Sequence, residues 1–270
     1  MPHGFFQDKV AVVTGGASGI GLAVCRELAG HGARIAMLDM DEEALSRISK
    51  EFSAKKIPVL GIACNVTDEE SCKAAMDKVL AGFGQIDILF NNAGITQRGV
   101  FEKTETSVFR KVMEVNFFGS LYCTKAALPA LIRTKGVIIV NESVAGVAPL
   151  LGRTGYSASK HALHGMFTSL RCELRHKGVH VMIVCPGFIR TNLQTRALGC
   201  DGRIATREQT KVGKEDTPEN VARQIIKGIE KKKAILVLTF MGKLGYLVSR
   251  LFPVLYEHLM TRQFKKELDE

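Results

Sequence analysis

Thr14-Gly15-Gly16-Ala17-Ser18-Gly19-Ile20-Gly21 is a glycine-rich turn that lies between the apolar run Val10–Val13 and an amphipathic segment. The order strand, glycine turn, helix is typical of a dinucleotide site, because free backbone N–H groups at a helix start bind a pyrophosphate. Gly15 allows the tight turn, Gly19 leaves room for the phosphate, and Gly21 lets the helix pack against the strand. Since many loops are merely rich in glycine, the rest of the chain must support this interpretation.

Apolar runs alternate with helical patterns along most of the 270 residues, which predicts a Rossmann-type, doubly wound α/β fold with a seven-stranded parallel sheet. The predicted strands are Val10–Val13, Arg34–Asp39, Val59–Ala63, Ile86–Phe90, Val137–Val140, Val179–Cys185 and Ala234–Leu238. The predicted helices are Ile20–His31, Glu42–Ser53, Asp68–Phe83, Thr106–Arg133, Tyr156–His176 and Pro218–Lys231. The composition shows no break, so we expect a single domain over residues 1–270 with its core over residues 6–240.

Two segments depart from this alternation. Residues 192–216 are polar and irregular, which predicts a substrate lid. Residues 241–270 carry an apolar repeat at helical spacing, which predicts an amphipathic helical extension that kinks or restarts at Pro253. The repeat consists of Leu244, Leu247, Val248, Leu251, Phe252, Leu255 and Leu259.

The apolar face of this extension must pack against an apolar partner. The sequence is compatible with three partners: the chain's own pocket, a second subunit or a membrane surface. We place packing within the molecule or between subunits before peripheral membrane contact. The membrane alternative rests on the amphipathic pattern and its basic flanks. These flanks are Lys243, Arg250, Arg262, Lys265 and Lys266.

The net charge of +10 raises the question of a nucleic-acid partner. We expect none, because the basic residues cluster near the C-terminus and form no surface interleaved with aromatic side chains. The 7 cysteines show no metal-ligand spacing and fit reduced thiols, and no secretion signal precedes the first strand. We therefore expect a cytoplasmic protein, in peripheral contact with a membrane if the extension binds lipid, and no metal site.

Asp39 ends the second predicted strand, 18 residues beyond Gly21. A carboxylate at this place accepts hydrogen bonds from the adenosine ribose and repels a 2′-phosphate, which favours NAD over NADP. The alternative is that Asp39 caps the helix that begins near Asp41.

Tyr156 and Lys160 are four residues apart and therefore share one face of a predicted helix. A neighbouring ammonium favours the phenolate form of a tyrosine, so Tyr156 is a candidate acid or base near neutral pH. Ser143, at the end of the fifth strand, is a candidate donor to a substrate oxygen, unless it merely ends that strand. His161 and His164 lie on the same helix, and we assign them no role because the Tyr156–Lys160 pair accounts for the proton transfer.

Together these motifs resemble the ordinary, single-domain branch of the short-chain dehydrogenases/reductases, over roughly residues 6–240. The resemblance rests on Thr14-x-x-x-Gly19-x-Gly21, Asp39, Asn65-Val66, Asn91-Asn92-Ala93-Gly94, Asn116, Ser143, Tyr156-x-x-x-Lys160 and Pro186-Gly187 with Thr191. Asn65 departs from the common aspartate, and Glu142 departs from the usual small serine pair, with no role that the sequence explains.

The resemblance implies hydride transfer between a nicotinamide and a secondary alcohol or ketone, with Tyr156 as the general acid or base. The substrate is expected to be apolar, because the run Gly155–Leu163 is similar to membrane-associated reductases of steroid- or lipid-like carbonyls. The implied catalytic residues are Asn116, which would hold a water of a proton relay, Ser143, Tyr156 and Lys160. The implied residues for the cofactor, NAD, are Gly15, Ser18, Gly19, Ile20, Gly21, Asp39, Asn65, Val66, Asn92, Ala93, Gly94, Tyr156, Lys160, Pro186, Gly187, Ile189 and Thr191.

The family also implies a homodimer or homotetramer. A catalytically idle dinucleotide-binding sensor or scaffold is the alternative function. The presence of all four implied catalytic residues argues against it.

Overall fold

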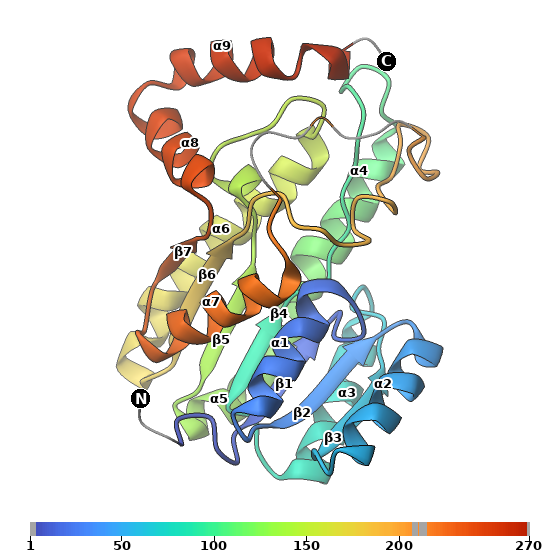
Figure 1. Ribbon diagram of the computed structural model, residues 1–270, viewed down its shortest axis with the longest axis vertical. Helices are drawn as coiled ribbons and strands as arrows, with labels where there is room; N and C mark the ends of the chain where they lie inside the picture. The colour runs from blue at the N-terminus through green and yellow to red at the C-terminus, as the bar shows by residue number, and fades with distance from the viewer. Residues whose placement is uncertain (1–3, 207–209, 211–214, 269–270) are drawn as a thin grey trace.

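Figure 1 shows the computed structural model, which describes residues 4–206, 210 and 215–268. Its seven strands form one sheet of order β3-β2-β1-β4-β5-β6-β7, in which every neighbouring pair is parallel. The predicted fold class is confirmed. The strands are β1 Val10–Thr14, β2 Arg34–Asp39, β3 Val59–Ala63, β4 Ile88–Asn91, β5 Val137–Asn141, β6 His180–Cys185 and β7 Ile235–Val237.

Helices cover both faces of the sheet (Figure 1). They are α1 Gly19–Gly30, α2 Glu42–Ala54, α3 Glu69–Phe83, α4 Thr106–Met113, α5 Gly119–Thr134, α6 Thr154–Leu174, α7 Pro218–Glu230, α8 Phe240–Leu251 and α9 Pro253–Gln263. Capping side chains fix several helix starts: Asp68 accepts a hydrogen bond from the Glu70 N–H before α3, and Thr217 accepts one from the Asn220 N–H before α7.

Two apolar cores lie on opposite faces of the sheet, because successive side chains of a strand point in opposite directions. On β1, Val12 belongs to the core that includes side chains of α3, α5 and α6. Its neighbour Val13 belongs to the core built with α1, α2 and α7. The carboxyl ends of the parallel strands therefore meet at one edge between the two helical layers, where doubly wound proteins bind their ligands.

The predicted helix Thr106–Arg133 is helical throughout, but it is not a single regular α-helix. A π-helical turn, Glu114–Phe118, separates α4 from α5. Within this wider turn Asn116 is fully buried, and its side-chain amide bonds to the backbone of Ile95. Apolar spacing cannot reveal this change, because a π-helical turn alters the hydrogen-bond pattern over only a few residues.

The C-terminal extension forms two helices, α8 and α9, which extend away from the sheet (Figure 1). Pro253 begins α9, as expected for a residue that restarts a helix. Leu247, Leu251 and Leu255 are more than half exposed on this pair of helices. No helix within the described residues is long and apolar enough to span a bilayer.

Candidate active site

A cavity of about 1000 Å³ opens at the carboxyl edge of the sheet and reaches α8 and α9. The predicted site residues on its wall are Gly15, Ser18, Gly19, Ile20, Asn92, Ala93, Gly94, Ser143, Tyr156, Lys160, Pro186, Gly187, Ile189 and Thr191. Five predicted residues do not line it: Gly21, Asp39, Asn65, Val66 and Asn116. The glycine turn and the Tyr156–Lys160 pair therefore share one cavity, although more than 130 residues separate them in the sequence.

The glycine turn provides the geometry that a pyrophosphate needs. Gly15 and Gly19 have φ angles of +61° and +52°, which favour glycine over residues with a Cβ. The α1 helix begins at Gly19, and its first turn holds no acidic residue that would repel an anion. These residues fit the diphosphate of a dinucleotide, because Gly15, Ser18, Gly19 and Ile20 line the cavity at the start of α1, and a helix start offers free N–H groups to an anion.

Asp39 lies at the end of β2, beside the glycine turn. Its Oδ2 accepts a hydrogen bond from the Ala17 N–H at 3.0 Å, and Oδ1 accepts one from the Asp41 N–H at 3.2 Å. The cap of α2 is Asp41, which accepts from the Ala44 N–H, so the capping alternative for Asp39 is wrong. The carboxylate of Asp39 is thus held next to the turn that would receive the cofactor.

Thr14 and Asn92 connect β1 to β4 beneath the glycine turn. The Thr14 hydroxyl oxygen accepts from the N–H groups of Asn92 and Ala93, both at 2.9 Å. The Asn92 amide donates to the carbonyl oxygens of Thr14 and Gly15, at 3.0 and 3.2 Å. These bonds fix the turn relative to the sheet.

Asn65 and Val66, the predicted neighbours of an adenine, follow β3. The side-chain oxygen Oδ1 of Asn65 accepts from the N–H and hydroxyl of Thr67, at 3.1 and 2.9 Å. Val66 is buried against Gly119 at the start of α5. Both residues follow β3, which pairs with β2. They therefore lie in the same half of the sheet as Asp39, which ends β2.

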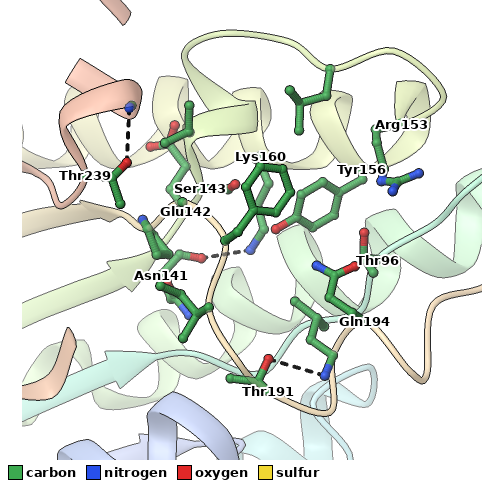
Figure 2. A pocket seen from close by; sticks show the side chains of 18 of the residues that line it. Thr96, Asn141, Glu142, Ser143, Arg153, Tyr156, Lys160, Thr191, Gln194 and Thr239 are labelled. Atoms are coloured by element: carbon green, nitrogen blue, oxygen red, sulfur yellow. Dashed lines mark hydrogen bonds between the residues drawn. The ribbon is translucent and has the colours of Figure 1, made fainter. Parts of the chain in front are cut away.

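Ser143, Tyr156 and Lys160 gather at the carboxyl end of β5. Figure 2 shows the Tyr156 hydroxyl and the Lys160 amino group directed into the same part of the cavity, with Ser143 nearby. The Lys160 Nζ donates to the Asn141 carbonyl oxygen at 2.8 Å and lies 5.6 Å from the centre of the Tyr156 ring. Ser143 lies close enough to Tyr156 to act on the pKa of its phenol.

The pKa of Tyr156 differs from the expectation based on its lysine neighbour. Burial raises this pKa above its ordinary value, against the smaller lowering effects of the Ser143 side chain and the Arg153 charge. Burial also lowers the pKa of Lys160 to about 8. Because burial raises the pKa of Tyr156, the phenol that faces the cavity is protonated at neutral pH.

Asn116 lies behind this group, in the π-helical turn. Its Oδ1 accepts from the Ile95 N–H at 2.8 Å, and its Nδ2 donates to the Ile95 carbonyl and the Ser159 hydroxyl at 3.0 and 2.9 Å. The side chain therefore ties the loop after β4 to α6, the helix that carries Tyr156 and Lys160.

Several wall residues were not predicted from the sequence. The Asn141 carbonyl oxygen accepts a hydrogen bond from the Lys160 ammonium. Arg153, three residues before Tyr156, forms an ion pair with Glu267 at 3.6 Å. Glu142 is buried and bonded to His164, the residue four positions beyond Lys160. The position of His164, four residues beyond Lys160 on the same helix, was the sequence signal that could have indicated its place near the site. No local pattern connects residues as distant in the sequence as Arg153 and Glu267.

Comparisons with known proteins agree with this geometry. The model of the short chain dehydrogenase family matches residues 9–198. The chain is 35% identical to Dehydrogenase/reductase SDR family member 7B of Bos taurus over 97% of this chain and 83% of that protein. It is 33% identical to Dehydrogenase/reductase SDR family protein 7-like of Drosophila melanogaster over 96% of this chain and 81% of that protein.

Solved structures show the same fold. A short-chain dehydrogenase/reductase from Burkholderia phymatum, in complex with NAD, superposes with a TM-score of 0.78 at 25% identity, over 86% of this chain and 89% of that one. An alcohol dehydrogenase from Thermococcus sibiricus, complexed with 5-hydroxy-NADP, superposes with a TM-score of 0.74 at 26% identity, over 86% of this chain and 96% of that one. From the family match, the relatives and the shared fold, we conclude that this chain belongs to the short-chain dehydrogenase/reductase family of oxidoreductases.

Proposed function

We propose that the protein is an NAD(H)-dependent oxidoreductase that interconverts a secondary alcohol and a ketone. The observation that carries this proposal is the placement of Ser143, Tyr156 and Lys160 on the wall of the cavity that also holds the glycine turn. A bound nicotinamide would supply or accept the hydride at C4. A catalytically idle sensor has no need for this group of side chains beside the dinucleotide site.

Each side chain has a distinct task in this proposal. The Tyr156 phenol donates its proton to the carbonyl oxygen during reduction, or accepts the hydroxyl proton during oxidation. Ser143 hydrogen-bonds the substrate oxygen and so stabilises developing alkoxide charge. Lys160 holds the nicotinamide ribose, and Asn116 fixes the loop after β4 and holds a relay water.

An apolar substrate is supported by the part of the cavity farthest from the sheet. Leu150, Leu244, Val248 and Leu259 line it, and the last three belong to α8 and α9. Part of the apolar face of the extension thus covers the chain's own cavity. We assign residues 192–216 as the substrate lid, because Leu193 and Gln194 also line the cavity; residues 207–209 and 211–214 of this segment lie outside the described residues.

A panel of hydrophobic secondary alcohols and ketones, tested with NAD(H) and NADP(H), is expected to give turnover with the non-phosphorylated cofactor. Because the Asp39 carboxylate repels a 2′-phosphate, we expect a preference for NAD of at least about tenfold, equal to about 1.4 kcal/mol. Absorbance of the reduced nicotinamide measures turnover, and thermal stabilisation measures cofactor binding.

Asp39→Asn is the matched control for cofactor choice, because it removes the charge and keeps an oxygen that can accept from Ala17. We expect this variant to lose most of the preference. Tighter binding of NADP by the wild-type protein would contradict the role of Asp39. Cofactor binding without turnover across the whole panel would favour the idle sensor.

We propose that the exposed part of α8 and α9 contacts an anionic lipid surface, so that the enzyme works in the cytoplasm at a membrane. Support comes from exposed apolar side chains, among them Leu247, Leu251, Phe252, Val254 and Leu255, beside the exposed basic Lys243, Arg250 and Arg262. Apolar burial and attraction to anionic headgroups act together in such helices. We also propose the family's homodimer or homotetramer as the assembly.

Co-sedimentation with vesicles is expected to retain the protein on anionic phospholipid more than on zwitterionic phospholipid, and less at high salt. A Leu247→Glu/Leu255→Glu variant is expected to lose this retention, whereas Phe101→Glu, on an exposed aromatic outside the extension, is expected to keep it. If the double variant instead changes the oligomeric state and leaves vesicle binding unaltered, the face is a subunit interface.

A further inference from the structure

Glu142 is a buried carboxylate for which the proposed reaction has no use. It follows β5 directly and precedes Ser143, and its side chain is completely covered. Its Oε2 is 3.1 Å from the Nδ1 of His164, while Oε1 is buried with no hydrogen-bond partner within the described part of the chain. Gly146 makes room for this side chain, because a Cβ there would overlap the carboxylate. Burying a carboxylate costs free energy, so its place beside the catalytic residues calls for an explanation.

His164 continues the row of catalytic residues on α6. Tyr156, Lys160 and His164 follow one another at intervals of four residues and therefore lie on the same face of the helix. Lys160 donates to the carbonyl oxygen of Asn141, the neighbour of Glu142 on β5. The end of β5 thus contacts this row twice, through the Asn141 carbonyl at Lys160 and through the Glu142 carboxylate at His164.

The charges around Glu142 oppose the effect of burial. Burial raises the pKa of Glu142, while the His164 hydrogen bond and the charges of His164, Lys160 and His161 on α6 act to lower it. Conversely, the negative charge of Glu142 acts to raise the pKa values of Lys160 and Tyr156, and of Cys185 on β6. Lys160 is also close enough to Cys185 to lower the pKa of that thiol. An anion at this place therefore favours protonation of both catalytic side chains.

We propose that Glu142 and His164 are positioning residues that hold the proton on Tyr156 and Lys160 and thereby set the upper pH limit of carbonyl reduction. The proposal rests on the proposed oxidoreductase function. His164 donates to the carboxylate and keeps it ionised inside the protein, and the carboxylate in turn stabilises the Lys160 ammonium and the Tyr156 phenol. His164 reaches solvent, with 17% of its side chain exposed, so the pair can exchange protons with water.

The test is the pH profile of kcat for carbonyl reduction, the direction in which Tyr156 must carry its proton. In Glu142→Gln the loss of the anion moves the alkaline limb to lower pH by about 1 unit. His164→Leu removes the donor, leaves a carboxylate that protonates, and gives the same shift. His164→Asn restores an N–H near the position of Nδ1 and is expected to recover the wild-type limb.

His161→Gln is the matched control, because His161 lies on the same helix, bonds to the Ser157 carbonyl of its own turn, and has the smallest effect among the groups that act on the pKa of Glu142. In this variant the alkaline limb of the pH profile of kcat is expected to stay within a few tenths of a pH unit of the wild-type position. His164→Leu added to Glu142→Gln is expected to produce no further shift, since the two residues act as one pair. A limb that stays in place in folded Glu142→Gln protein overturns the proposal.

Two further measurements separate this proposal from the proposed function. NMR titration of ¹⁵N-lysine-labelled protein, with Lys160 assigned through Lys160→Arg, gives the Lys160 midpoint without turnover, and it should fall in Glu142→Gln. Because burial raises the pKa of Glu142, its charge costs stability above its ordinary pKa, and Glu142→Gln should unfold at an equal or higher temperature at pH 8. An unchanged Lys160 midpoint overturns the pair's role, whereas an inactive wild-type protein overturns only the proposed function.

Discussion

Replacement of Tyr156 by phenylalanine is expected to lower kcat by about 100- to 10,000-fold, because the variant keeps the ring and loses the group that transfers the proton in the proposed mechanism. The phenol is the acidic side chain directed into the part of the cavity where Ser143 and Lys160 converge (Figure 2). Burial raises its pKa, so at neutral pH it holds the proton that a carbonyl oxygen must receive. Turnover of reduced nicotinamide with the best ketone of the panel measures the loss.

Two observations make the Tyr156 result specific. NAD should still raise the unfolding temperature of Tyr156→Phe, since the glycine turn is unaltered. Tyr122→Phe, a change of the same kind on α5 outside the cavity, should keep wild-type turnover. Full activity of Tyr156→Phe would show that another group moves the proton and would overturn the mechanism.

Replacement of Gly21 by alanine is expected to abolish NAD binding and to lower the free energy of unfolding by about 1–3 kcal/mol. A Cβ at this position would overlap the Gly15 carbonyl oxygen and lie 2.6 Å from the Asn92 Nδ2. Neither neighbour can move easily, because the Asn92 amide is bonded to the carbonyl oxygens of Thr14 and Gly15. Relief of the overlap must therefore displace the turn that we propose as the pyrophosphate site.

Gly30→Ala provides the matched control at the other end of α1. A Cβ there meets nothing within 4 Å, and the residue is exposed. Alanine is expected to stabilise the protein by about 0.4–1 kcal/mol and to leave NAD binding unchanged, because it restricts the unfolded chain. Thermal unfolding with and without NAD compares the two variants; equal behaviour of both would contradict the packing argument for Gly21.

The fold was largely predictable because its signals are local. Short apolar runs followed by helical spacing identified all seven strands, and their order along the sheet follows the connection rules of doubly wound folds. Errors lay at element ends, such as the start of β4 at Ile88 in place of Ile86, and at the π-helical turn around Asn116. These features depend on hydrogen bonds, which residue periodicity does not encode.

The site was predictable where its residues belong to one local motif. Tyr156 and Lys160 share a helix face by spacing alone, and the glycine turn follows directly from its neighbouring strand. The lowering of the Tyr156 pKa by Lys160 beside an oxidised nicotinamide stays a prediction; in the protein alone, burial raises this pKa and the ammonium bonds to Asn141. Burial and the direction of an ammonium both depend on side chains distant in the sequence.

By itself the sequence determined the parallel α/β fold, the glycine turn and the tyrosine–lysine pair, because each leaves a pattern in residues close along the chain. Only the tertiary structure joined these motifs in one cavity and revealed the pairs Glu142–His164 and Arg153–Glu267. Such pairs form when the end of a strand or the C-terminal segment meets α6. Local propensity carries no information about these long-range contacts, since they depend on how the complete chain packs.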